Sequence, residues 1–187
     1  MSRTAVLLVD AQNDFFPGGA LPVPGGDAIL PAANALLETA AVRGWPVVAS
    51  RDWHPEDHTS FVTAGGPWPV HCVRGTAGAE LHPALRLPPV FTMVHKATER
   101  DRDAYSAFEG TGLAGALRER GIGKLYVGGL ALDYCVKASC LDARREGFET
   151  VLVLPATRAV NVTPGDGEAA LEALREAGVT VVEEVPR

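Results

Sequence analysis

Short apolar runs alternate with segments of helical pattern along the chain, and this alternation constrains the fold more strongly than any other feature. Residues 4–9 form a continuous apolar run that ends at Asp10, which is typical of a strand buried on both faces of a parallel sheet. Further strands are predicted at residues 45–50, 90–95, 124–127, 151–154 and 179–184, and helices at about residues 28–42, 111–120, 136–146 and 166–177. This alternation predicts an α/β fold in three layers, α/β/α, around a doubly wound, mainly parallel six-stranded sheet.

Length and composition predict one domain spanning residues 1–187. The chain has 187 residues, of which 47% are hydrophobic, enough for a full core. Its formal net charge is -6 and it has no basic run, which argues against nucleic acid and an anionic membrane surface as partners. No apolar run approaches the ~20 residues of a membrane span. The first residues lack a signal-peptide profile, and three cysteines at unrelated spacings suggest no disulfide framework, so we expect a cytoplasmic protein.

Reactive side chains follow four of the predicted strands at the point where each strand ends. Asp10 follows the first strand, Asp52 and His54 the second, Lys96 the third, and Cys135 the fourth. Each of them alone has an ordinary explanation, such as a turn residue or a solvated strand end. Ligands of open α/β sheets bind outside the carboxyl ends of the strands, so we expect these side chains to meet at one edge.

Cys135 is the candidate nucleophile of this edge. It follows an apolar run and a glycine pair and stands at the start of a predicted helix, where the helix dipole and unpaired backbone N–H groups favour a thiolate. Asp10 would accept the thiol proton and return it to the leaving amine, and Lys96 would keep the site charged. The N–H groups of Ala131 and Cys135 would hold the developing oxyanion. The competing interpretation is that Cys135 is a small, packed core residue.

A second group, Asp52, His54 and His71, has the composition of a metal site. Residues two apart on an extended segment point to the same side, so Asp52 and His54 can share one ion, with His71 reaching it from a long loop. One carboxylate and two imidazoles suit Zn²⁺, Mn²⁺ or Fe²⁺. His58 is left open as an extra ligand, with a surface role favoured. Structural roles are predicted for the remaining histidines, His82 and His95.

Several motifs together resemble the nicotinamidases (pyrazinamidases) of the isochorismatase-like hydrolases. They are VDAQNDFFPGGAL at residues 9–21, RDWHP at 51–55 followed by His58, Ser60 and Phe61, WPVHCV at 68–73, Lys96, DAYSAF at 103–108, and GLALDYCV at 129–136. The resemblance runs nearly from end to end. Two positions depart from the usual pattern of that family, since Leu132 stands where many members have threonine and Ala97 where many have glycine.

The resemblance implies hydrolysis of nicotinamide to nicotinate and ammonia through a thioester, with pyrazinamide as a further substrate. It implies a catalytic triad of Asp10, Lys96 and Cys135, in agreement with the interpretation of the strand ends. It also implies that the metal bound by the Asp52 group receives the pyridine nitrogen and so orients the ring. Zinc is the expected ion, and iron or manganese would fit the same ligands.

The same resemblance assigns a substrate-binding set. Phe15 and Trp68 match aromatic residues that sandwich the ring, and Tyr105 matches a residue near the pocket. Leu130 and Ala131 match a pair joined by a cis peptide bond, which would turn the Ala131 N–H toward the oxyanion. The substrate is thus a small molecule, and assembly into a homo-oligomer is left open.

Three alternatives compete with this interpretation. Relatives that cleave N-carbamoyl compounds or ureidoacrylate share the triad and lack the metal ligands, and isochorismatases lack the cysteine nucleophile. The histidines of the Asp52 group argue against both. A redox or metal-storing thiol protein would need a resolving thiol near Cys135. Cys140 is predicted to face away as a core residue, and a structural role is favoured for Cys72.

Overall fold

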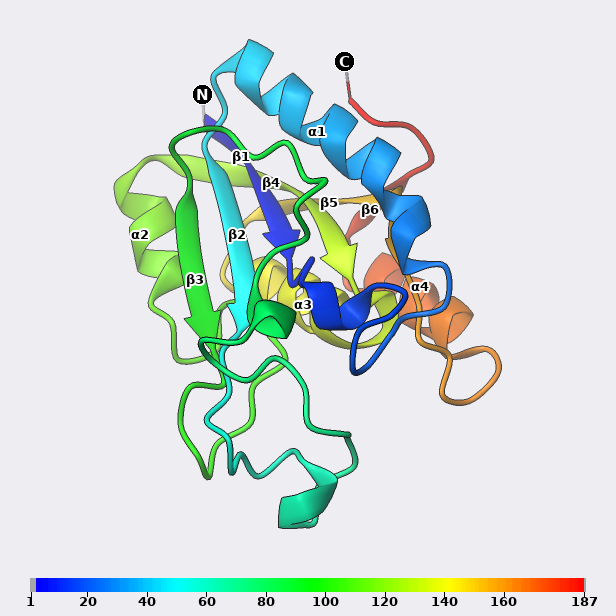
Figure 1. Ribbon diagram of the computed structural model, residues 1–187. Coiled ribbons are helices and arrows are strands. Elements are labelled where there is room, and N and C mark those ends of the chain that lie inside the picture. Colours follow the sequence, from blue (N-terminus) through cyan, green and yellow to red (C-terminus); the bar gives the residue numbers. More distant parts are fainter. Residues whose placement is uncertain (1–2, 187) are drawn as a thin grey trace.

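Six parallel strands form the central sheet of the computed structural model, which describes residues 3–186 (Figure 1). The strands are β1 (Arg3–Val9), β2 (Val47–Asp52), β3 (Thr92–Lys96), β4 (Ile122–Leu130), β5 (Glu149–Arg158) and β6 (Thr180–Val182). They lie in the order β3-β2-β1-β4-β5-β6, and every neighbouring pair is parallel. This is the doubly wound sheet that the alternation predicts. Of the predicted span 1–187, residues 1, 2 and 187 lie outside the described part.

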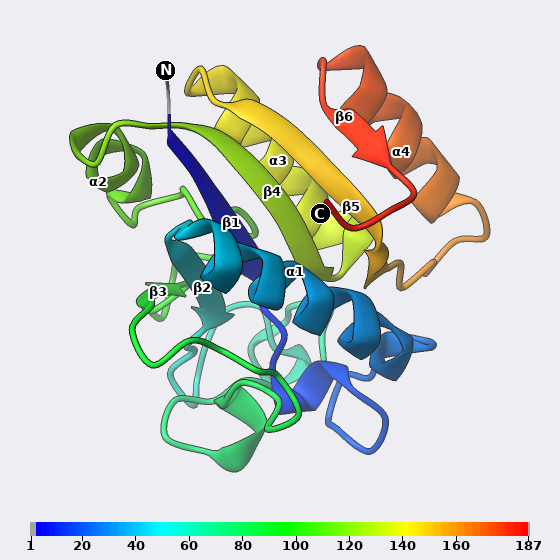
Figure 2. The same ribbon diagram turned by 90° about the horizontal axis from the view of Figure 1, so that it is seen from above.

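Helices cover both faces of the sheet and complete the predicted three layers (Figure 2). Helix α1 (Leu30–Arg43) packs on one face, while α2 (Leu113–Glu119), α3 (Lys137–Arg145) and α4 (Asp166–Glu176) pack on the other. Strand β1 shows how the sequence supplies both cores. Its Leu7 and Val9 belong to the cluster with α2, α3 and α4, and its Val6 and Leu8 belong to the cluster with α1. A side chain on every second residue points to the same face, so a continuous apolar run serves two cores.

The ends of several elements differ from their predicted positions. The first helix was expected from about residue 28, but a 3-10 turn at Gly26–Ile29 comes first and α1 begins at Leu30. Pro31 accounts for this start, because proline lacks an N–H and fits only the first turn of a helix. The helix expected from residue 136 is preceded by a π-helical turn, Leu132–Val136. Strands β4 and β5 are longer than predicted.

The winding direction of the sheet reverses between β1 and β4. From β1 the chain winds toward β2 and β3, and β4 returns to the other side of β1. Such a switch point opens a crevice at the carboxyl ends of the strands, where ligands bind. The two strands approach closely here, since a Cβ on Gly129 would lie 1.9 Å from the Val9 carbonyl oxygen. Much of the long segment of residues 53–91 folds over this edge of the sheet, and its last part runs back along the sheet to the start of β3 (Figure 1).

Within the described residues, no helix has both the length and the apolar character that a membrane span requires. This agrees with the absence of a long apolar run in the sequence.

Candidate active site

The ends of four strands bring Asp10, Asp52, Lys96 and Cys135 together, as the sequence predicts. The ammonium nitrogen Nζ of Lys96 lies 2.9 Å from Asp10 Oδ2, 2.5 Å from Asp52 Oδ1 and 3.4 Å from Cys135 Sγ. It also donates a hydrogen bond of 3.1 Å to the Ala104 carbonyl. One buried cation thus contacts two carboxylates and the thiol.

Asp10 has the environment of a general base. It ends β1 in the left-handed region, with φ 45°, and its Oδ1 accepts a hydrogen bond of 2.7 Å from the Ser50 hydroxyl. Oδ2 forms the ion pair with Lys96 but receives no aligned hydrogen bond from any residue in 3–186, so it is available to a thiol proton. Burial raises the pKa of Asp10 to about 6, although Lys96 acts to lower it. A carboxyl with a pKa in this range is a much better proton acceptor than a solvated one.

Burial of Cys135 opposes the thiolate that the start of a helix favours. Its side chain is buried in the π-helical turn before α3, and burial raises the pKa of the thiol well above its usual value, despite the opposing effect of Lys96. Removal of water penalises the charged form more than the neighbouring ammonium and helix start favour it. The resting group is therefore a thiol, and its activation depends on a base such as Asp10.

Activity should accordingly fall in mild acid as Asp10 takes up a proton. Below pH about 6, the pKa to which burial raises Asp10, kcat/KM should drop by about tenfold per pH unit, because only the ionised carboxylate accepts the thiol proton. The measurement is the rate of amide hydrolysis from about pH 8 to about pH 5, with circular dichroism to confirm that the protein stays folded. A rate that stays constant over this range would exclude Asp10 as the base.

Asp52, His54 and His71 form the predicted metal-ligating group. Their ligand atoms all lie within 4.8 Å of one another, and all three residues are buried. His54 Nδ1 lies 3.1 Å from the Ala97 carbonyl and His71 Nδ1 lies 2.7 Å from the Pro69 carbonyl. Each Nδ1 must be the hydrogen-bond donor, so each Nε2 offers a lone pair.

The charge states of this group also fit a cation. Burial lowers the pKa of His54 to about 4, so its imidazole is neutral as a metal ligand requires. Carbonyl acceptors on the far nitrogens are the usual support of ligating histidines. The residues present therefore fit a divalent metal ion.

Asp52 joins the triad and the metal-ligating group, which the sequence analysis treated as separate. Its Oδ1 faces Lys96 at 2.5 Å, and its Oδ2 lies 3.8 Å from His54 Nε2. Burial alone would raise the pKa of Asp52, but Lys96 and His54 lower it, so the carboxylate stays charged. Burial alone would likewise lower the pKa of Lys96, but Asp10 and Asp52 raise it well above its usual value.

His58 is buried, so the favoured surface role is wrong. Its Nδ1 pairs with the Ser60 hydroxyl at 2.7 Å and its Nε2 with the Arg102 carbonyl at 3.1 Å, while its ring stacks on His54 with centroids 4.2 Å apart. With both nitrogens occupied, it supports His54 rather than acting as an extra ligand. His95 is exposed and stacks on Trp53 at 5.1 Å, which agrees with its predicted structural role.

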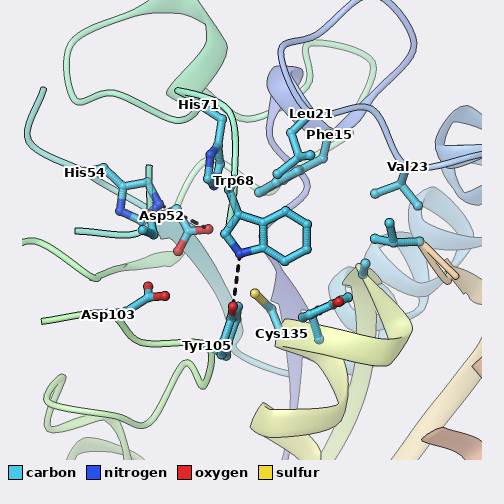
Figure 3. Close-up of a pocket in the computed structure, with 14 residues that line it drawn as sticks. Phe15, Leu21, Val23, Asp52, His54, Trp68, His71, Asp103, Tyr105 and Cys135 are labelled. Atoms are coloured by element: carbon cyan, nitrogen blue, oxygen red, sulfur yellow. Dashed lines mark hydrogen bonds and ion pairs between the residues drawn. The ribbon is translucent and has the colours of Figure 1, made fainter. Parts of the chain in front are cut away.

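A cavity of about 490 Å³, its open mouth included, lies between Cys135 and the metal-ligating group (Figure 3). Its lining contains three of the predicted site residues with aromatic side chains, Phe15, Trp68 and Tyr105. Trp68 Nε1 donates a hydrogen bond of 3.0 Å to the Tyr105 hydroxyl, which fixes the indole over the cavity. Cys135 and Ala131 lie in the wall as well. The space suits a flat, small ligand.

Leu130 does not line this cavity. Its side chain is completely buried in the core on the α1 face, near Gly26. Leu130 was predicted to belong to the substrate-binding set, but its side chain points away from the crevice that its successor Ala131 lines. The predicted cis peptide bond between Leu130 and Ala131 is present.

Sequence reasoning missed the apolar corner of the cavity. Val23 and Val160 line it together with Leu21 and Tyr134. Asp133, two residues before Cys135, accepts backbone hydrogen bonds from Val160 at 2.9 Å and from Asn161 at 2.8 Å, and so holds that loop against the cavity. The apolar residues come from segments far apart in the chain, and no local pattern marks them as neighbours. Asp133 lies inside the GLALDYCV motif, and this position could have marked it as a residue near the site.

The other two cysteines do not form a redox pair with the nucleophile. Cys72, Cys135 and Cys140 are all free and buried. Cys140 packs in the core on the α3 side, as predicted, and burial raises the pKa of the Cys72 thiol. The interpretation as a redox thiol protein therefore loses its support.

Comparison with known proteins adds four findings. The family model described as the isochorismatase domain matches residues 4–184. The nicotinamidase of Escherichia coli (strain K12) is 40% identical over 202 residues, covering 97% of this chain and 95% of the relative. The crystal structure of a Pyrococcus horikoshii pyrazinamidase in complex with zinc matches with a TM-score of 0.92 and 47% identity, over 96% of this chain and 98% of the other. An L. infantum protein in complex with nicotinate matches with a TM-score of 0.90 and 41% identity, over 97% and 92%.

Proposed function

The chain belongs to the isochorismatase family, and on this premise we propose that it is an amidohydrolase that converts nicotinamide to nicotinate and ammonia, with pyrazinamide as a second substrate. The observation that carries this proposal is the shared cavity: one aromatic-walled space has the buried Cys135 thiol on one side and the two imidazoles and the carboxylate of the metal-ligating group on the other. The similar proteins from E. coli, P. horikoshii and L. infantum support the same activity.

The first half of the reaction forms a thioester. Cys135 Sγ attacks the carboxamide carbon while its proton passes to Asp10 Oδ2, the oxygen without an aligned hydrogen bond. The Ala131 and Cys135 N–H groups are the proposed donors to the oxyanion. The Lys96 ammonium balances the negative charge shared by the sulfur and the carboxylates. As the C–N bond breaks, Asp10 returns the proton to the leaving amine and ammonia departs.

The second half releases the acid. Asp10, ionised again, takes a proton from a water molecule that attacks the thioester carbon. The C–S bond breaks, Asp10 passes its proton to the sulfur to restore the thiol, and the new acid loses its remaining proton to solvent and leaves as nicotinate. Burial keeps Cys135 protonated at rest, so the free enzyme returns to the state in which it began.

Asp52, His54 and His71 are the residues that would hold the divalent ion, which we propose is zinc, with iron or manganese suited to the same donors. When bound, the ion supplies a Lewis acid for the ring nitrogen and so orients the ring. Phe15 and Trp68 are proposed to sandwich the ring, and the Trp68–Tyr105 hydrogen bond holds that wall in place. The triad of Asp10, Lys96 and Cys135 carries out the reaction at the amide carbon.

The lining of the cavity argues against the carbamoyl-acid alternative. Ureidoacrylate, N-carbamoyl amino acids and isochorismate all carry a carboxylate, which normally requires a cationic side chain for recognition. None of the described residues that line the cavity is a lysine or an arginine. Two acidic residues, Asp52 and Asp103, do line it. A neutral aromatic amide suits this lining better than an anion.

The test is ammonia release by zinc-loaded protein from four compounds: nicotinamide, pyrazinamide, benzamide and an N-carbamoyl amino acid. Nicotinamide and pyrazinamide should be hydrolysed efficiently. Benzamide, which has the same shape but no ring nitrogen, should have a much lower kcat/KM. Faster turnover of the carbamoyl compound than of nicotinamide would refute the proposed substrate.

Removal of the metal should weaken substrate binding while the fold survives. The variant His54→Ala, or treatment of the wild type with a chelator, should lower kcat/KM for nicotinamide at least ~10-fold, because ligand loss costs metal affinity and the ring nitrogen loses its partner. Metal content, activity and melting temperature should be measured on the same sample. Activity that persists in protein shown to be metal-free would contradict this half of the proposal.

We also propose that residues 1–187 form a single cytoplasmic domain. One sheet with its two covering layers accounts for the described part of the chain, and the family match extends over residues 4–184. Three free cysteines agree with a reducing compartment.

A further inference from the structure

Gln12 is a completely buried polar residue that the reaction itself does not use. Its side-chain amide forms hydrogen bonds with both the N–H and the carbonyl of Asp52. The Asp52 N–H donates to Gln12 Oε1 at 2.8 Å, and Gln12 Nε2 donates to the Asp52 carbonyl at 2.8 Å. The same Nε2 donates to the Ala79 carbonyl at 2.9 Å. All three contacts satisfy buried backbone groups.

The position of Asp52 in the sheet explains why these hydrogen bonds are needed. On one side, Asp52 pairs with Lys96 of β3. On the other side, β1 pairs with β2 only as far as Leu8 and Ala49, and the Asp10 N–H donates a last backbone bond to Ser50. Beyond that point, β1 turns away through Asp10 in its left-handed conformation.

An amide side chain presents one donor and one acceptor, as a peptide group does. The Gln12 amide therefore takes the place of the strand that β1 no longer provides, and it extends the pairing of β2 to Asp52. This permits two things at once: β1 bends to bring Asp10 to the thiol, and Asp52 stays in a regular strand.

We propose that Gln12 is a positioning residue for the divalent ion, acting through the main chain of Asp52. The proposal rests on the proposed function in taking Asp52 as a metal ligand. Asp52 divides its carboxylate between Lys96 at 2.5 Å and the His54 side at 3.8 Å. With one oxygen held by Lys96, the direction of the other depends on where the backbone of Asp52 stands. Gln12 determines that position and so aligns Oδ2 with the two imidazoles.

Two substitutions separate this role from simple packing. Gln12→Met has nearly the same shape and makes none of the three hydrogen bonds. Gln12→Glu keeps the length of the side chain and an acceptor for the Asp52 N–H, but it loses the amide donor to the two carbonyls. The control is Asn34→Leu. Asn34 lies in α1, and its half-buried side-chain amide donates to the Ala84 carbonyl at 2.9 Å and accepts from the Arg86 N–H at 2.7 Å of a loop that carries no proposed ligand.

The measurement is zinc affinity, by competition with a chromophoric chelator, together with the visible spectrum of the cobalt-loaded protein and the melting temperature. Gln12→Met should bind zinc about 10- to 100-fold more weakly than wild type, with an altered cobalt spectrum, and Gln12→Glu should also bind more weakly. Asn34→Leu should lower the melting temperature with zinc affinity and spectrum unchanged.

A folded Gln12→Met protein with wild-type zinc affinity and cobalt spectrum would overturn the proposal, as would an equal loss of affinity in Asn34→Leu. If Gln12→Met does not fold, Gln12→Glu decides in the same way. Wild-type protein that binds no zinc or cobalt would instead overturn the proposed metal site, so the two failures are distinguishable.

Discussion

Replacing Cys135 with alanine should reduce turnover of nicotinamide by at least ~10⁴-fold, since removal of a covalent nucleophile abolishes the pathway that the remaining groups serve. The loss should be confined to chemistry. Cys135 is a small residue in the cavity wall, and its replacement leaves the aromatic side chains and the metal-ligating group in place. Nicotinamide binding, measured by calorimetry on zinc-loaded protein, should therefore stay close to wild type.

The chain offers a matched control for this prediction. Cys140 is also free and buried, but it lies in α3 and packs in the core rather than at the cavity. Cys140→Ala should retain activity and cost only a little stability, as small core deletions do. A Cys135→Ala enzyme that turned over nicotinamide at the wild-type rate, or a Cys140→Ala enzyme that did not, would exclude the assignment of the nucleophile.

Lys96→Met should abolish catalytic activity and lower the free energy of unfolding. Lys96 is completely buried between Asp10 and Asp52, and its removal leaves two carboxylates without their shared cation. Breaking a buried ion pair in this way costs roughly 3–5 kcal/mol of unfolding free energy, and the charge balance that supports thiol activation is lost with it. Urea denaturation gives the free energy of unfolding, and ammonia release gives the activity.

The pH dependence of this destabilisation provides a second check. Without Lys96, the two carboxylates can escape their buried charge by taking up protons. The difference in unfolding free energy between Lys96→Met and wild type should therefore shrink as the pH is lowered. Lys124→Met is the control, because Lys124 pairs with Glu149 at the surface at 2.8 Å, and such pairs contribute at most about 1 kcal/mol. A destabilisation by Lys96→Met no larger than that of the control would contradict the proposed role.

Much of the site could be predicted because parallel sheets obey a simple rule. The residue after each buried apolar run lies at the carboxyl edge, so Asp10, Lys96 and Cys135 were expected to meet before any coordinate was known. The alternation of side chains along an extended segment also placed Asp52 and His54 on the same side. These inferences need only the periodicity of apolar residues and the direction of the strands. Both can be predicted from residues that are close together in the sequence.

Other properties depend on contacts that no local pattern reveals. The charge state of Cys135 is an example: the start of a helix favours a thiolate, but burial raises the pKa of the thiol, and burial is the sum of everything packed around the sulfur. The buried position of His58, the inward direction of Leu130 and the approach of Val160 to the cavity were likewise decided by segments far away in the chain.

Thus the sequence by itself determined the layers of the fold, the reactive edge of the sheet and the identity of the groups that meet there. Only the tertiary structure decided that Asp52 belongs to both groups and that Gln12 takes the place of a missing strand beside it. The physical reason is the separation along the chain over which each kind of interaction acts. Backbone periodicity acts between residues a few positions apart, whereas desolvation and shared hydrogen bonds act across space between whichever residues the completed fold brings into contact.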